Sequence, residues 1–266
     1  MSLTSKTISS SYKDILQLDN SNNGIATTRK DVKSGDGTTS SISLSDDSMR
    51  IVPQNDDTTA TFQVNSKSGT ELLKVDATNT AVKTLGQYAN TNIKQFHYTS
   101  INSKPNTANT WSALDAQSGG GRFRSTVIEM GTGGTPATTY DVSGGNVADD
   151  LVMSIWYVPF NIAIDSCNVW FGADTATGDD VKFSIMSYTI STANDATGGD
   201  LSAGVENCVS PSAITGAGYE QAYYQSLTIS TANVDAGKAI MAFVHMDDVN
   251  SDLSVNLQLV YHLRSA

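Results

Sequence analysis

The sequence has few cysteines, few charged residues and no long hydrophobic run. Its two cysteines, Cys167 and Cys208, are too few for a secreted disulfide scaffold. No segment approaches the ~18 apolar residues that a membrane-spanning helix needs, and residues 1–6 lack the apolar core of a secretory signal. We therefore expect a protein that is made in the cytoplasm, stays soluble and has no membrane partner.

Helix-forming and basic residues are also scarce. Charged residues make up 16% of the chain and aromatic residues 8%, and Lys and Glu, which usually fill exposed helix faces, are few. Ser, Thr, Asn, Asp and Gly, which favour turns and extended backbone, occur in nearly every segment. The formal net charge is -11, and no cluster of Lys and Arg is large enough to neutralise a run of phosphates. Composition predicts an all-β fold and no nucleic-acid partner.

Short apolar pairs with a spacing of two residues recur between residues 25 and 86. Examples are Ile42 with Leu44, Met49 with Ile51, and Phe62 with Val64. This alternation is typical of half-buried strands, and Gly- and Asp-rich turns such as 35–37, 66–69 and 76–79 separate them. A ladder of about 60 residues with so few large apolar side chains is marginal as an isolated domain. We therefore predict an oligomeric β stalk that packs against copies of itself.

Longer strands are predicted from residue 122 onward. They cover residues 123–130, 151–158, 162–171, 181–190, 219–229, 239–246 and 253–263. Strands of this number and length, separated by Gly/Thr/Asp-rich loops such as 194–204, predict a β-sandwich or jelly roll.

The chain accordingly divides into four predicted segments. These are an N-terminal segment (1–24), the stalk (25–86), a connector (87–121) and the β-sandwich domain (122–266). Within the connector, residues 94–101 are interpreted as a strand and residues 111–116 as a short helical turn.

Two stretches resemble segments of bacteriophage virion proteins. Phe62-Gln63-Val64 followed by Gly69-Thr70-Glu71-Leu72-Leu73-Lys74-Val75-Asp76 resembles the β repeat of phage fibre stalks. Ile155-Trp156-Tyr157-Val158-Pro159-Phe160, which leads into Ile162 and Ile164, is similar to the start of jelly-roll domains that end many phage fibres. The resemblance implies a homotrimeric virion fibre or spike. Its N-terminal region would attach to other virion proteins of the capsid or tail, and its C-terminal head would be exposed to the host surface.

Catalytic motifs are missing from the sequence. No nucleophile elbow, phosphate-binding loop or His-Glu-x-x-His helix is present. His97, His245 and His262 fall on predicted strands and are interpreted as structural, although His245 and His262 can approach one another if their strands are neighbours. Glycan cleavage needs two facing carboxylates, and the four glutamates are scattered. We expect no enzyme and no cofactor.

Two weaker hypotheses concern ligands. Asp174, Asp179 and Asp180 are the best candidates for a calcium site, with local turn capping as the alternative. Tyr219, Gln221 and Tyr223 share one face of a predicted strand and are candidates for binding a host surface glycan, with Tyr224 pointing away. Packing in the core or at a subunit interface is the alternative for these three residues.

The leading hypothesis is therefore a non-enzymatic, homotrimeric head or tail fibre of a phage particle, located in the virion. A capsid decoration protein that clamps neighbouring shell subunits is the first alternative, and a glycan-cleaving tailspike is the second. Cys167 and Cys208 are expected to be buried thiols, with a disulfide between them as the alternative.

Overall fold

The structure is a computed structural model that describes residues 15–21, 23–100, 108–114, 128–141, 147–174, 180–191, 200–215, 221–247 and 252–264. The chain divides into two compact units, Met1–Ala89 and Asn90–Ala266, here called the N-terminal unit and the C-terminal unit. In the described ranges every regular element except the helix α2 (Val147–Ser154) is a β-strand. The predicted all-β fold is confirmed.

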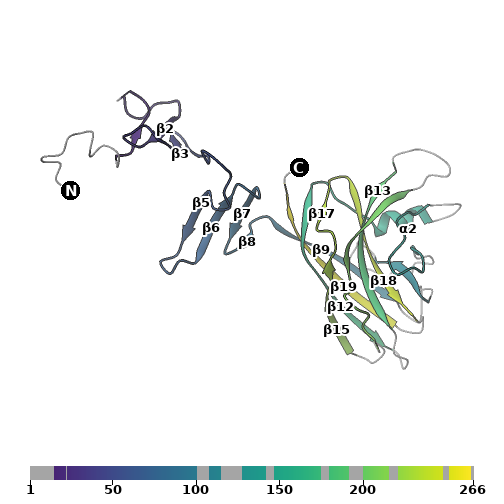
Figure 1. Cartoon of the computed structure of the whole chain (residues 1–266). Helices are drawn as coiled ribbons and strands as arrows, with labels where there is room; N and C mark the ends of the chain where they lie inside the picture. Colours follow the sequence, from purple (N-terminus) through teal and green to yellow (C-terminus); the bar gives the residue numbers. More distant parts are fainter. Residues whose placement is uncertain are drawn as a thin grey trace. The chain divides into compact units, whose positions relative to one another are not determined.

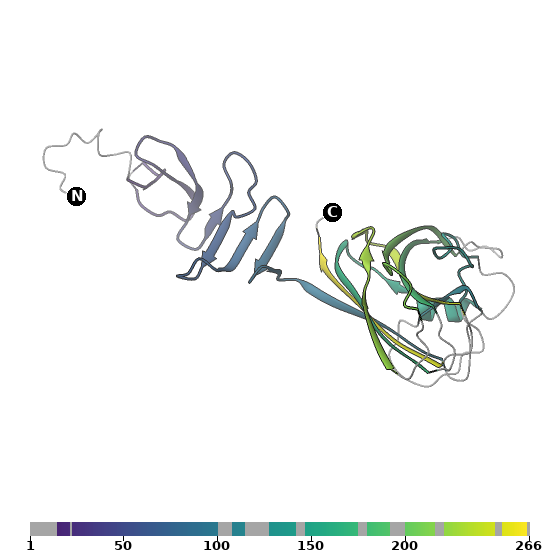
Figure 2. The same ribbon diagram turned by 60° about the horizontal axis from the view of Figure 1, so that its bottom comes forward.

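The N-terminal unit contains two four-stranded antiparallel sheets in which each strand pairs with the next one along the chain. The first sheet is β1 (Gln17–Leu18), β2 (Lys30–Lys33), β3 (Thr39–Leu44) and β4 (Met49–Ile51). The second is β5 (Phe62–Asn65), β6 (Glu71–Asp76), β7 (Ala81–Thr84) and β8 (Gln87–Tyr88). Figure 1 and Figure 2 show the strands of the second sheet side by side in a single layer. Gly37 and Gly69 lie in the predicted turns with φ of 90° and 87°, a conformation that glycine adopts without strain.

The C-terminal unit is a sandwich of two antiparallel sheets. Sheet I has the strand order β15 (Gln221–Ser226), β12 (Ile162–Asp174), β19 (Asp252–Leu263) and β9 (Thr91–Ser100), with β17 (Asn233–Val234) also paired to β12. Sheet II has the order β10 (Thr110–Ala113), β18 (Lys238–Met246), β13 (Val181–Ile190), β14 (Leu201–Val209) and β16 (Thr228–Ile229). The short β11 (Trp156–Tyr157) also pairs with β18.

The strand order is that of a jelly roll. When β9, β10, β12, β13, β14, β15, β18 and β19 are numbered 1 to 8 along the chain, sheet I reads 6-3-8-1 and sheet II reads 2-7-4-5. In this order most neighbours in a sheet are distant in sequence and successive strands often change sheet, which is the double Greek key of jelly-roll domains. The predicted β-sandwich is therefore present.

The main core lies between the two sheets. Phe171 of sheet I and Phe183 of sheet II have ring centroids 5.1 Å apart, and both are almost fully buried. Cys167 on β12 and Cys208 on β14 join the same core as free thiols. The two cysteines meet across the sandwich. A hydrogen bond with Cys208 is the main cause that raises the pKa of the Cys167 thiol, and burial of the thiol is the second.

A second core covers the outer face of sheet II. Met186, Tyr188 and Phe243 point away from sheet I and pack with Ile128, Met130 and Leu151. Leu151 belongs to α2, which lies beside β13 and β18 in Figure 1. The predicted strand over residues 151–158 was therefore wrong for its first half. The helical spacing of three buries Leu151 and Ser154 on one side and leaves Val152 69% exposed.

Three segments near the sheet edges also differ from the sequence interpretation. β9 lies in the range assigned to the connector and pairs along its whole length with β19. Residues 110–113 form β10, paired with β18, rather than a helical turn. β14 begins inside a predicted loop, because Gly204 allows the backbone to approach Thr138, whose carbonyl accepts a hydrogen bond of 2.8 Å from the Gly204 amide.

Candidate functional site

The outer face of sheet I in the C-terminal unit carries exposed aromatic side chains. Residues 167, 169 and 171 of β12 point into the core, so the alternation of the strand turns Asn168 and Trp170 outward. Trp170 is 42% exposed and Tyr224 on β15 is 56% exposed. The helix α2 covers the outer face of sheet II, whereas these aromatic rings on the outer face of sheet I are exposed to solvent.

Two rows of side chains cross this face from β15 to β9. The register places Tyr224 opposite Trp170, Trp170 opposite Asn256, and Asn256 opposite His97. The neighbouring row consists of Ser226, Asn168, Gln258 and Gln95. Directly opposed residues of antiparallel strands point to the same side of a sheet. These eight residues are called the aromatic–amide face.

A compact hydrogen-bonded group holds the β15 end of the aromatic–amide face. Ser226 Oγ donates to Asn168 Oδ1 at 2.7 Å, and the Tyr224 hydroxyl lies 3.0 Å from the same oxygen and 2.8 Å from Ser226 Oγ. The Tyr224 and Trp170 rings are tilted by 47° with centroids 5.4 Å apart. Both aromatic rings are therefore exposed but held in position.

Polar groups of the same face keep hydrogen-bonding capacity. Within the described part of the chain, no group accepts a hydrogen bond from Asn168 Nδ2 or from the Trp170 indole. The Oδ1 atom of Asn256 is buried without a donor among the described residues. Asn168 Nδ2 and the Trp170 indole therefore remain available as donors to a polar ligand, in exchange for water.

The aromatic–amide face is uncharged when His97 is neutral. On the neighbouring part of β12 and β19, His262 Nδ1 lies 2.9 and 3.0 Å from the two carboxylate oxygens of Asp165. Lys94 lies on the opposite, inward side of β9, with its ammonium 5.6 Å from the Phe96 ring and 5.9 Å from the Trp156 ring. Burial lowers the pKa of Lys94. The face thus offers stacking surfaces and amides rather than charge.

The predicted glycan-binding residues occupy different places. Tyr219 lies outside the described residues, and Gln221 is an exposed residue at the start of β15. Tyr223 is half-buried on the inward side, where its ring stacks on Phe171 at 5.0 Å and 17°. The outward tyrosine is Tyr224, its neighbour. The sequence does contain a signal for Trp170. In Asn168-Val169-Trp170-Phe171, the tryptophan stands at an outward position of an alternating strand, where a polar residue is expected.

The predicted calcium ligands are only partly described. Asp174 ends β12 opposite Asp252, and Asp179 lies outside the described residues. The backbone amide of Asp180 donates to the carboxylate of Asp247 at 2.6 Å, a contact between residues 67 positions apart in the sequence. In the ranges that the structure covers, no group of three or more His, Cys, Asp or Glu side chains is arranged to hold a metal ion.

The histidines considered as a pair belong to different sheets. His262 on β19 contacts Asp165, whereas His245 on β18 packs on Trp111 with ring centroids 5.1 Å apart. Burial of the imidazole, and next the positive charge of Lys182, lower the pKa of His245. Neither described contact joins the two rings.

Among the helices of the described ranges, none has the length and apolarity to cross a membrane.

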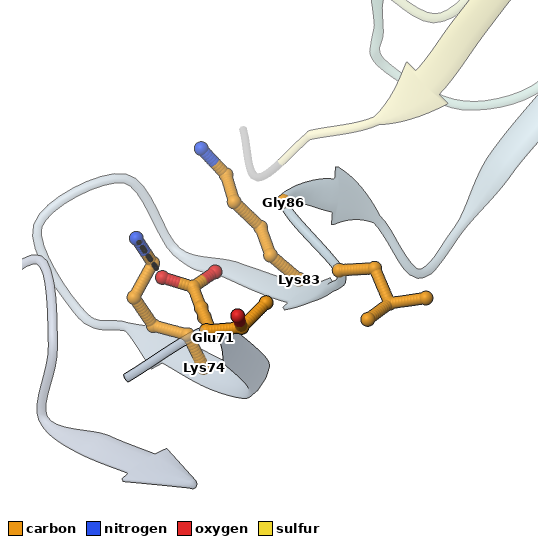
Figure 3. A pocket seen from close by; sticks show the side chains of 6 residues that line it. Glu71, Lys74, Lys83 and Gly86 are labelled. Carbon is orange, nitrogen blue, oxygen red and sulfur yellow. Dashed lines mark ion pairs between the residues drawn. The ribbon is translucent and has the colours of Figure 1, made fainter. Parts of the chain in front are cut away.

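A hollow on the second sheet of the N-terminal unit is lined by Thr70, Glu71, Lys74, Lys83, Leu85 and Gly86. Figure 3 shows Glu71 and Lys74 as an ion pair, with Lys74 Nζ 2.8 Å from Glu71 Oε2. Lys83 Nζ lies 4.6 Å from the centre of the Tyr88 ring. The charged groups of the hollow therefore have protein partners already, which disfavours a ligand site there.

Each of the two N-terminal sheets has one apolar side. In the second sheet Phe62, Val75 and Val82 are directly opposed, as are Val64 and Leu73. In the first sheet Ile42 opposes Ile51 and Leu44 opposes Met49. These nine residues are called the apolar face. Val64, Val82 and Met49 are 40%, 44% and 60% exposed, and Gln63, Lys74 and Lys83 lie on the reverse side.

Buried side chains are almost missing from this unit. Among its described residues, 15–21 and 23–89, the only fully buried side chains are Ser43 and Asp76, and both are polar. A β-sheet with one apolar side needs another layer to cover that side. The N-terminal unit therefore presents a second candidate site, an interface for protein packing.

No protein-family model matches the sequence, and no curated protein is significantly similar to it.

Proposed function

We propose that this protein is a non-enzymatic structural fibre or spike of a phage particle. The N-terminal unit forms a homotrimeric stalk, and the C-terminal jelly roll is the head that contacts the host surface. The N-terminal region attaches the trimer to other virion proteins. This proposal joins the resemblance of residues 62–64 and 69–76 to phage stalk repeats with the packing of the two units.

The observation that carries the proposal is the apolar face of the N-terminal unit. Its two sheets contain no buried apolar side chain among the described residues, although Phe62, Val75 and Val82 are aligned across three strands. Burial of apolar area contributes about 25 cal/mol per Å², and a single layer cannot bury such side chains on its own. Copies of the same chain supply matching apolar faces.

Three copies fit this arrangement. Identical chains related by a closed rotation axis present the same surface toward that axis. Around a threefold axis, three amphipathic sheets place their apolar faces inward and leave Gln63, Lys74 and Lys83 outside in water. The resemblance to phage fibres supports three chains rather than two.

The C-terminal unit suits an exposed head because it has its own core. Two of the described glutamates have side-chain partners: Glu71 pairs with Lys74 at 2.8 Å, and Glu206 accepts a hydrogen bond of 2.9 Å from Ser230 Oγ. They lie in different units. This supports a structural role rather than a hydrolase, which needs two carboxylates facing one glycosidic bond.

Light scattering on the full chain tests the oligomer. We expect a mass of three chains of 28.1 kDa. The double variant Val64→Asp/Val82→Asp places charges on the apolar face and is expected to have the mass of one chain. The matched control Gln63→Asp changes the adjacent position on the reverse side, opposite Lys74, and should remain trimeric. A wild-type mass of one or two chains contradicts the proposal.

Electron microscopy of virions labelled with an antibody against the C-terminal unit tests the location. A fibre places the label away from the particle surface, at the tip of a projection. Label that lies flat and evenly over the capsid would instead support a decoration protein, and a complete lack of label would contradict a virion location.

A further inference from the structure

We propose that the aromatic–amide face of sheet I binds an uncharged glycan chain, laid across the strands from Tyr224 on β15 toward His97 on β9. The binding itself depends only on the C-terminal unit. Its role as the host contact of a fibre rests on the function proposed above.

The side-chain chemistry of the face matches a sugar. Pyranose rings have an apolar side formed by C–H groups and a rim of hydroxyls that donate and accept hydrogen bonds. Trp170 and Tyr224 offer exposed rings for the C–H side, and Asn168, Gln258 and Gln95 offer amides that both donate and accept. Recognition sites generally combine such apolar surface with a few placed polar groups.

The aromatic end of the face is already organised. Asn168 Oδ1 receives the Ser226 hydroxyl at 2.7 Å and lies 3.0 Å from the Tyr224 hydroxyl. This leaves the Nδ2 of Asn168 directed to other acceptors. Side chains that are fixed before binding lose little conformational entropy when a ligand arrives, which favours affinity.

The length of the face suits a chain rather than a single sugar. Three strand-to-strand steps separate Tyr224 from His97, and steps of about 4.8 Å give a span of about 14 Å. The amides of Asn168, Gln258 and Gln95 follow this span as a parallel row. A short oligosaccharide can therefore contact several strands at once.

The lack of charged residues on the face favours a neutral glycan over an anionic one. None of the eight residues of the face is Lys, Arg, Asp or Glu, and the protein as a whole has a formal net charge of -11. An anionic polysaccharide would approach an acidic protein without a cationic partner on the face. The alternative occupant, a second copy of the chain, is less suited, because the centres of protein interfaces are usually apolar and well packed. This face has a row of amides at its centre.

An array of immobilised glycans tests the proposal with the full-length protein. It should contain neutral oligosaccharides of hexoses, N-acetylhexosamines and deoxyhexoses beside sialylated, sulfated and uronic-acid forms. We expect binding to one or more neutral glycans, and at least about a tenfold loss of affinity for Trp170→Ala. Tyr224→Phe keeps the ring but removes the hydroxyl from the Asn168 group, so a smaller loss is expected. Binding to none of the glycans, or only to acidic ones, overturns the proposal.

Controls separate this result from misfolding and from self-association. Phe160→Ala removes another exposed aromatic side chain, 62% exposed, outside the aromatic–amide face, and should bind as the wild type does. If Trp170→Ala retains wild-type binding, the face is not the glycan site. If Trp170→Ala lowers the mass measured by light scattering, the face is an interface between copies and the proposal fails. A monomeric wild type that still binds neutral glycans would contradict the fibre and leave the glycan site in place.

Discussion

The two units of the molecule use antiparallel strands in opposite ways. In the C-terminal unit, Phe171 and Phe183 meet between two sheets, and a second core covers sheet II. In the N-terminal unit, aligned residues such as Phe62 and Val75 stay partly exposed on single-layer sheets. The difference shows that strand alternation creates an apolar side, but that only a second layer turns this side into a core. One unit contains that layer within the chain, and the other is proposed to obtain it from further chains.

The largest expected effect is the loss of a core side chain in the C-terminal unit. Phe183→Ala should lower the free energy of unfolding of this unit by about 3–5 kcal/mol, since the large buried ring is removed and a cavity remains. Tryptophan fluorescence during urea unfolding measures it, because all 3 tryptophans (Trp111, Trp156 and Trp170) belong to this unit. The effect should not depend on protein concentration. A loss below about 1 kcal/mol would contradict an independent core.

The corresponding change in the N-terminal unit should depend on concentration. Phe62→Ala removes apolar area from the apolar face and should weaken each chain's contribution to the trimer by about 1.5–3 kcal/mol. Dilution should then lower the apparent mass and the β-sheet circular dichroism signal, while the tryptophan transition stays in place. Gln63→Ala, on the reverse side, serves as the control. Identical dilution curves for the two variants would argue against a stalk interface.

Glycine substitutions separate lack of space from backbone strain. A Cβ at Gly204 would lie 2.6 Å from Tyr188 Cε1 and 2.8 Å from Thr138 Cα, so Gly204→Ala should destabilise the C-terminal unit by about 1–3 kcal/mol. At Gly69, where φ is +87°, a Cβ would meet no atom within 4 Å, so the cost of Gly69→Ala should come from backbone strain alone and amount to about 1–2 kcal/mol.

Asparagine distinguishes the two causes. Asn adopts positive φ more readily than Ala, so Gly69→Asn should recover part of the stability that Gly69→Ala loses, as measured by thermal melting. Gly204→Asn should be less stable than Gly204→Ala, because the larger side chain has even less room. The reverse order at either position would refute the assigned cause.

The smallest expected effects concern pH, and they occur in different windows. In the C-terminal unit, the pKa of His245 is lowered by burial and by Lys182, against weaker opposing effects of a hydrogen bond with the Asn109 backbone and of Asp247. Its contribution to stability is present above the unfolded value of about 6.5 and is lost as the pH falls through the lower folded pKa. The tryptophan transition should therefore weaken on mild acidification, and His245→Gln should reduce this dependence.

In the N-terminal unit, hydrogen bonds hold the pKa of Asp76 below its usual range. The Asp76 carboxylate accepts one hydrogen bond from the Asn79 side chain and one from the Asn79 backbone amide, both at 2.9 Å. The stability that it contributes is present above the unfolded value of about 3.9 and is lost as the pH falls through the folded pKa. Circular dichroism of this unit should change only below about pH 4, and less so in Asp76→Asn. A common pH window for both units would contradict this separation.

Local alternation made much of the fold predictable. The prediction for residues 181–190 coincides with β13, and those for 239–246 and 253–263 are within one residue of β18 and β19. Apolar and polar residues alternate in the first half of β13 and in β19, whereas β18 is a short apolar run that is buried on both sides. Turns with glycine at positive φ, at Gly37 and Gly69, were predicted for the same local reason. The prediction failed at α2, where Leu151 is buried by contact with sheet II rather than by alternation, and at β14, whose polar sequence is a strand only beside β13.

The candidate site was less predictable than the fold. Tyr223 and Tyr224 were correctly expected to point to opposite sides, but the side that faces the core depends on β12, where Tyr223 stacks on Phe171. The aromatic–amide face combines residues from four strands, with His97 and Tyr224 at its ends. No local pattern brings these positions together, because the jelly-roll strand order pairs segments that are far apart in the sequence.

By itself, the sequence determined many of the strands and turns and the two-sided character of the alternating strands, since these follow from residue spacing and backbone preference over a few residues. It also determined that residues 25–86 contain too little apolar material for a core of their own. The tertiary structure alone decided which side of each strand is covered. Sheet II is covered by α2, whereas Trp170 and Tyr224 of sheet I remain exposed, because burial depends on long-range packing that a local pattern does not encode.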